Sequence, residues 1–175
     1  MLGLASSREV RRTVLSFGRE FQRVVGIEKE PVRPEADFLS PLAASLHGWW
    51  VEAGAGGMPR RSRFDVAEHG RLVPNLFLVE RLESGAFRFR VRGEGVLDLL
   101  GGASRGPFAA DHRPADFGHL LSQHYQSVLD LGTCVRCRGS LAFRDRSRSA
   151  FESVDCPLAD DAGAARYIIG VIEAC

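Results

Sequence analysis

The sequence predicts an α+β domain: a five-stranded antiparallel sheet with helices on one face, preceded by an N-terminal helical extension. The first reason is a change of period, because apolar residues recur with a helical period before Pro74 and alternate in several segments after it. The second is the order of the expected elements, which are two helices, two strands, short helices, one long helix and three strands. The chain of 175 residues, 45% hydrophobic and 26% charged, is long enough for one such domain.

The first expected element is a helix that begins near Ser6. Ser6 and Glu9 form a capping box, and Gly26 supplies a C-terminal stop. The apolar residues between them recur at steps of four and three, and they are Val10, Val14, Phe17, Phe21 and Val24. This is the spacing of a coiled coil, so we predict that the stripe is the seam of a homodimer. Packing onto the chain's own domain and binding to a membrane surface are the alternatives.

A linker separates this helix from the rest of the chain. Residues 29–37 carry two prolines among charges, a composition typical of a linker. We therefore divide the chain into an N-terminal helix and linker, residues 1–37, and a main domain, residues 38–175. The main domain begins with a second helix, which we expect to start at Ser40 because a proline follows it at the first helical position.

Strands follow this second helix. Residues 75–82 form the first, and in the second Phe87, Phe89 and Val91 alternate with arginines, as in a half-buried strand. A long helix over residues 117–131 has a single apolar stripe. Three further strands are expected at residues 133–143, 150–158 and 166–173.

Several segments of the main domain are similar to a known family. They are the pair Trp49-Trp50, residues 59–65 (PRRSRFD), residues 76–80 (LFLVE), residues 89–96 (FRVRGEGV) and the turn at 156–161 (CPLADD). By these segments the chain resembles a bacterial, stand-alone subfamily of the PAS domain family, the fifth of its subfamilies. Arg63 and Val66 depart from the pattern, which has an acidic residue and a proline there.

The resemblance implies a PAS fold with a cavity between the sheet and the helices. It also implies a sensory or regulatory role, with a small ligand, protein–protein interaction or both. Since no kinase, cyclase or DNA-binding domain is attached in this sequence, we expect the module to act through a signalling partner or as a homodimer. A haem-binding or other small-molecule sensor is the alternative, and a small enzyme is a third.

The apolar faces of the second strand, of the short helical turn at residues 96–100 and of the long helix predict which residues line this cavity. They are Phe87, Phe89, Val91, Leu97, Leu120, His124, Tyr125 and Val128. His124 lies within the apolar stripe of the helix, where a buried imidazole needs a partner or stays neutral. It is either a core histidine bonded to a neighbour or, because haem-binding PAS proteins use a histidine on this helix, a haem ligand.

The four cysteines are expected to be mostly reduced thiols in a cytoplasmic protein. Cys134 and Cys137 form a C-x-x-C pair, but residues three apart on a strand point to opposite faces. We therefore predict no metal site and no disulfide between these two cysteines.

Charge and hydropathy exclude several classes of function. The net charge of +1, from 23 basic and 22 acidic residues, argues against nucleic-acid binding. No apolar run approaches the ~20 residues of a membrane span. No local signature of a catalytic constellation is present, so we expect no enzyme. Five arginines are expected on the outward side of the strands: Arg88, Arg90, Arg92, Arg136 and Arg138. They either form a basic face that binds an anion or are paired with nearby carboxylates.

Overall fold

The computed structural model describes residues 21–34, 36–100, 107–108 and 117–175. Three short 3-10 turns lie between α2 and β2. The strands and helices are β1 (Phe21–Pro31), α2 (Pro41–Gly54), β2 (Leu76–Arg81), β3 (Phe87–Arg92), α3 (Glu94–Leu100), α4 (Phe117–Leu131), β4 (Val135–Phe143), β5 (Arg148–Ala159) and β6 (Ala165–Ala174). None of the helices in these ranges is long and apolar enough to cross a membrane.

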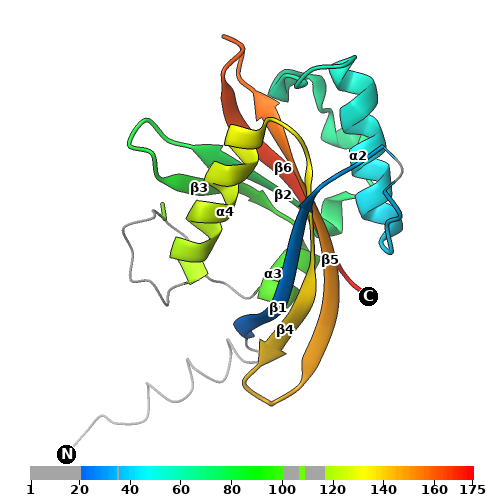
Figure 1. The fold of residues 1–175 in the computed structure, drawn as a ribbon, viewed down its shortest axis with the longest axis vertical. Helices are drawn as coiled ribbons and strands as arrows, with labels where there is room; N and C mark the ends of the chain where they lie inside the picture. Colours follow the sequence, from blue (N-terminus) through cyan, green and yellow to red (C-terminus); the bar gives the residue numbers. More distant parts are fainter. Residues whose placement is uncertain (1–20, 35, 101–106, 109–116) are drawn as a thin grey trace, which may run out of the picture.

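All neighbouring strands of the sheet are antiparallel, and their order is β1-β4-β5-β6-β2-β3. The hairpin of β2 and β3 and the meander of β4, β5 and β6 are the five strands that the sequence predicts. The hairpin and the meander form one sheet because β2 pairs with β6, which lies almost a hundred residues later in the chain. The fold class is therefore confirmed, with a sixth strand, β1, added at the free edge of β4 (Figure 1).

The sixth strand corrects the expected N-terminal helix. Phe21 and Val24 belong to β1, which pairs with β4 from Phe21 opposite Phe143 to Pro31 opposite Val135. Gly26 does not cap a helix: its φ of 60° lies at a register shift of the strand, where the left-handed conformation suits a β-bulge. The first residues of the expected linker are also strand. The remaining residues of the predicted homodimer seam, Val10, Val14 and Phe17, lie outside the described residues.

Helices cover both faces of the sheet rather than one. In Figure 1, α4 and α2 lie on opposite sides of the strands, and each face has its own apolar core. The first core joins the sheet to α3 and α4 through residues such as Phe77 and Val128. The second joins it to α2 through residues such as Leu46 and Val154. For this reason β5 is buried from Phe151 to Ala159 without the alternation of a half-solvated strand.

The start of α2 is fastened to β5. Ser40 is the N-cap of the helix, and its hydroxyl accepts a hydrogen bond from the amide of Ala43 at 3.0 Å, as the sequence predicts for this start. The amide of Ser40 donates at 2.6 Å to Glu152 of β5, whose carboxylate is fully buried. Arg138 of β4 donates to the same carboxylate at 2.7 Å. Arg138, one of the outward arginines, is therefore paired with a buried carboxylate next to the start of α2.

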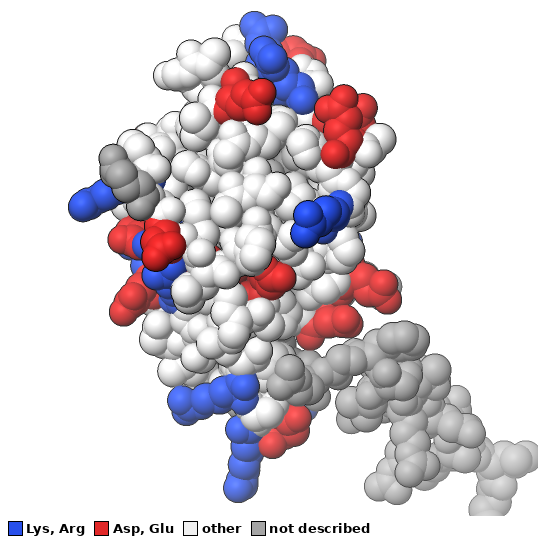
Figure 2. All heavy atoms as spheres, turned by 90° about the vertical axis from the view of Figure 1, so that its right-hand side faces the viewer, with Lys and Arg blue, Asp and Glu red and all other residues white. Residues whose placement is uncertain are grey.

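Charged side chains of both signs occur on the face shown in Figure 2. Basic and acidic groups lie around a largely uncharged middle, and the described residues drawn there form no patch of one sign. Elsewhere Glu80 forms ion pairs with three arginines of the strands, Arg88, Arg90 and Arg166, at 3.1 to 3.4 Å. Arg136 contacts Glu30 and the carbonyl of Asp37. Carboxylate partners are thus present for Arg88, Arg90, Arg136 and Arg138, which was one of the two interpretations.

Candidate functional site: an apolar cavity with a polar end

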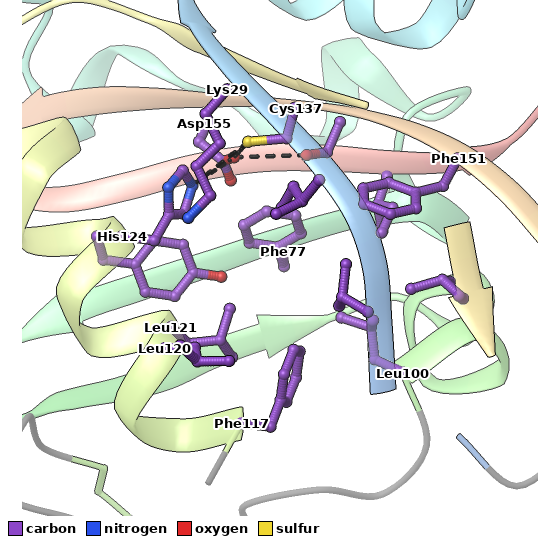
Figure 3. Close-up of a pocket in the computed structure, with 16 residues that line it drawn as sticks. Lys29, Phe77, Leu100, Phe117, Leu120, Leu121, His124, Cys137, Phe151 and Asp155 are labelled. Carbon is purple, nitrogen blue, oxygen red and sulfur yellow. Dashed lines mark hydrogen bonds and ion pairs between the residues drawn. The ribbon is translucent and has the colours of Figure 1, made fainter. Parts of the chain in front are cut away.

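A cavity of about 170 Å³ lies between α4 and the sheet. Its lining comes from five strands and two helices: Val24, Ile27, Lys29, Phe77, Leu100, Phe117, Leu120, Leu121, His124, Tyr125, Cys137, Leu141, Phe151, Ser153, Asp155 and Ile172. Figure 3 shows Phe117, Leu120 and Leu121 of α4 across from Leu100 of α3, with β1 passing alongside. Most of the wall is hydrocarbon, so a bound molecule would have to be largely apolar.

Local sequence explains how these side chains reach the cavity. Phe117, Leu120, Leu121 and His124 are spaced by three, one and three residues on α4, which places them on one side of the helix. On β5, Phe151, Ser153 and Asp155 are spaced by two and therefore share the face toward α4.

Three buried side chains from three elements form the centre of the polar end of the cavity, with Ser153 and the exposed Lys29 beside them. Nε2 of His124 on α4 lies 2.9 Å from Oδ2 of Asp155 on β5. The thiol of Cys137 on β4 lies 3.8 Å from the same ring nitrogen and 3.7 Å from the same carboxylate oxygen. The three residues are 9%, 3% and 2% exposed. With Asp155 ionised, the imidazole donates this hydrogen bond, and the pair satisfies two polar groups that would be costly to bury alone.

Burial raises the pKa of the Cys137 thiol, and the nearby charge of Asp155 raises it further. Burial also raises the pKa of Tyr125 well above its ordinary value, and negative charge at Asp155 and Cys137 acts in the same direction. Both groups therefore keep their protons at neutral pH, and the thiol by itself is a poor nucleophile. The polar end offers hydrogen bonds and metal ligands rather than a reactive thiolate.

The structure brings together some of the residues predicted to line a pocket. Leu120, His124 and Tyr125 line the cavity. Phe87 and Val128 are buried in the same apolar core, and Phe89 packs against it without lining the cavity.

Val91 and Leu97 do not belong to the cavity, since each is 39% exposed. Strict alternation fails in β3 because Val79 pairs with Phe89 whereas Leu78 pairs with Val91, which leaves Arg90 as an extra residue. Val91 therefore shares the side of Leu78, which packs in the core under α2. In α3, Val96 and Leu99 are the buried residues, and Leu97 turns outward.

Sequence reasoning missed the residues that complete the polar end. Cys137 was placed correctly on the inward face of its strand, but Asp155 and Ser153 were not considered. The signal for Asp155 is a single carboxylate between Val154 and Cys156, in a strand otherwise expected to be buried. An acid in such a position requires a partner. The sequence pattern did not indicate that β1 lines the cavity, because this segment was interpreted as a helix and a linker.

The cysteines differ from the expectation that they are reduced. Cys134 and Cys156 form a disulfide between β4 and β5, whereas Cys137 and Cys175 are free. Since Val135 pairs with Asp155, Cys134 lies opposite Cys156, and their Cα atoms are 4.2 Å apart. Both belong to the core under α2, on the face away from Cys137. The two residues of the C-x-x-C pair thus point to opposite faces, as the alternation predicts.

The fold and the cavity define an α+β domain with an internal pocket between its sheet and a long helix. A family model described as a PAS domain matches residues 39–173, and the chain therefore belongs to the PAS domain family. It is a sensory or regulatory module of that family.

Among solved structures, the chain is similar to one titled "Structure of an RNA-binding Light-Oxygen-Voltage Receptor", at 14% identity and a TM-score of 0.43. This match covers 89% of the present chain and 39% of the receptor chain. The chain thus spans about two fifths of that protein's length. A comparison with curated proteins finds no match.

Proposed function

We propose that this PAS domain is a non-catalytic sensor of a small, largely apolar molecule that binds in the cavity between α4 and the sheet. The observation that carries the proposal is the apolar cavity with a single polar end at His124 and Asp155. An apolar cavity of ~150 Å³ can hold benzene, so about 170 Å³ suits a ligand of roughly one ring. A polar substituent on that ring would meet the histidine and the carboxylate.

Haem at His124 is not part of this proposal. The cavity of about 170 Å³ is smaller than the ~300–1,000 Å³ of sites for drug-sized ligands, and haem is larger than such ligands.

The proposed output is a change at α2 that a protein partner recognises. β5 supports this route because it carries Asp155 in the cavity and Glu152 at the start of α2. A ligand that moves Asp155 would therefore move β5, and the opposite face of β5 contacts α2. Amide hydrogen exchange tests the route: binding should change the exchange of the first turn of α2 more than that of its last turn.

Ligand-observed NMR with phenol and toluene tests the pocket. Phenol should bind more tightly than toluene, because its hydroxyl can reach the polar end. Leu121→Trp should abolish binding of both by filling the cavity, whereas Leu131→Trp, at an exposed position of the same helix, should leave it unchanged. Binding of neither probe to the wild type, or equal loss in the two folded variants, would overturn the proposal. Native mass spectrometry of the freshly purified protein would then identify a molecule that co-purifies.

A further inference from the structure

The polar end of the cavity has the composition of a transition-metal site. Imidazole, thiol and carboxylate converge there from α4, β4 and β5, and their donor atoms lie within 4.8 Å of one another. In the part of the chain that the structure describes, this is the one group of three or more such side chains close enough to share an ion. All three are buried, which distinguishes them from the acidic clusters common on protein surfaces.

The distances between the donor atoms resemble those of a metal-bound set. Around tetrahedral zinc, ligand bonds of ~2.0–2.3 Å place neighbouring donor atoms about 3.3–3.8 Å apart. Here the sulfur lies 3.8 Å from the imidazole nitrogen and 3.7 Å from the carboxylate oxygen. The nitrogen and oxygen are closer, at 2.9 Å, because they share a hydrogen bond. Small side-chain rotations that lengthen this one contact would therefore complete the triangle.

We propose that His124, Cys137 and Asp155 bind one divalent transition metal ion of the zinc type, with a fourth coordination position open to the cavity. Three protein ligands and one open position are the arrangement of zinc sites that accept an exogenous ligand. The metal site stands without the proposed function, and only the occupant of the fourth position, the donor atom of a cavity ligand, rests on it.

The chemistry of the donors selects the class of ion. Thiolate and imidazole favour zinc, cobalt, nickel or copper over magnesium and calcium, which prefer oxygen ligands. Cys137 binds as the thiolate, so each ion that enters displaces the thiol proton, which leaves to solvent. His124 binds through Nε2, so the proton that Nε2 shared with Asp155 also leaves this nitrogen, and the neutral ring takes up a proton from solvent at Nδ1 instead. The charges of the thiolate and of Asp155 then balance the two positive charges of the ion, and the hydrogen bond between His124 and Asp155 is replaced by two bonds to the metal. The hydroxyl of Ser153 lies 3.5 Å from the same carboxylate oxygen and can orient it.

Titration with Co²⁺ tests the site directly. The full chain, stripped with EDTA and kept without thiol reductants so that Cys134 and Cys156 stay bonded, should bind one Co²⁺ per chain. Binding should produce a sulfur-to-cobalt charge-transfer band and the intense visible bands of a tetrahedral ion, and Zn²⁺ should remove both. Absence of stoichiometric binding, or binding without the charge-transfer band, in the wild type would overturn the proposal whatever the variants do.

Variants assign the ligands. Cys137→Ser should lose the charge-transfer band, and His124→Ala and Asp155→Asn should each weaken Co²⁺ binding by ~10-fold or more. Cys175→Ser removes the exposed free cysteine and should change nothing. A band that survives Cys137→Ser or disappears in Cys175→Ser refutes the assignment.

The two proposals fail separately. Phenol binding to the EDTA-stripped protein tests the cavity alone, and Co²⁺ binding without any organic probe tests the metal site alone. In the cobalt-loaded protein, imidazole should shift the visible bands by taking the open position. Unchanged bands at saturating imidazole would show that this position is closed and would overturn that part of the inference.

Discussion

Glu152→Gln removes a fully buried carboxylate that holds two elements at once. In the wild type, its two oxygens accept from the amide of Ser40 at 2.6 Å and from Nε of Arg138 at 2.7 Å. Glutamine has nearly the same volume, so the substitution leaves no cavity. Its amide nitrogen must nevertheless face one of the two donors, and that hydrogen bond is lost.

The expected loss of stability follows from burial and charge. Breaking a buried ion pair by removing one partner costs ~3–5 kcal/mol, and a hydrogen bond to a charged group contributes about 1.5–3 kcal/mol. Arg138 is one third exposed, so water can partly solvate its guanidinium once the carboxylate is gone. We therefore expect the low end of the first range, about 3 kcal/mol. For a chain of this length that corresponds to a fall in Tm of roughly 6–12 °C.

Urea denaturation followed by far-UV circular dichroism measures this loss. Glu83→Gln, in an exposed turn, is the matched control and should change the free energy of unfolding by less than ~0.5 kcal/mol. Combining Glu152→Gln with Arg138→Met should cost less than the sum of the single changes, because each removes the same contact. A loss below ~1 kcal/mol for Glu152→Gln, or additivity in the double variant, would refute the interpretation that this carboxylate ties the start of α2 to the sheet.

Three further predictions concern the sheet, and each is measured as a change in the free energy of unfolding. Gly170→Ala should cost ~1–3 kcal/mol, because the added Cβ would lie 2.2 Å from the ring of Phe77, and Phe77→Leu should recover part of this loss; an unaffected Gly170→Ala would contradict the packing. Reducing the disulfide between Cys134 and Cys156, which are 22 residues apart, should cost about 3 kcal/mol, and an equal stability with and without reductant would argue against the bond. Val91→Thr should stay within ~0.5 kcal/mol of the wild type, and a larger loss would place Val91 in a core.

Local patterns were sufficient for the five strands from β2 to β6 and for α4. The stripe of α4 was predictable because a helix between sheet and solvent must bury one side, and His124 falls on that side. The extra residue Arg90 in β3 was not predictable, because a bulge depends on the pairing with β2 and leaves no mark in the alternation itself. For this reason the pattern placed Phe89 correctly against the core and Val91 incorrectly.

The N-terminal segment shows a stronger effect of distant pairing. Phe21 and Val24 fit a helical stripe, yet the segment forms β1 because the edge of β4 offers backbone hydrogen bonds. That edge is more than a hundred residues away in sequence, as the pairing of Val24 with Leu141 illustrates. Local propensity cannot contain this information. The polar end of the cavity is non-local in the same sense, since His124 and Asp155 are 31 residues apart and meet only when the sheet is complete.

β5 carries two buried carboxylates on its two faces, and this arrangement links the cavity to α2. Asp155 and Glu152 are three residues apart, so they point to opposite faces of the strand. Each is compatible with burial only because of its partners, His124 on one face and Ser40 with Arg138 on the other. Neither carboxylate can give up its contacts without a substantial loss of free energy. A metal ion or ligand that draws Asp155 toward the cavity would therefore pull on β5 and strain the contacts of Glu152, and this is the proposed route from α4 to α2.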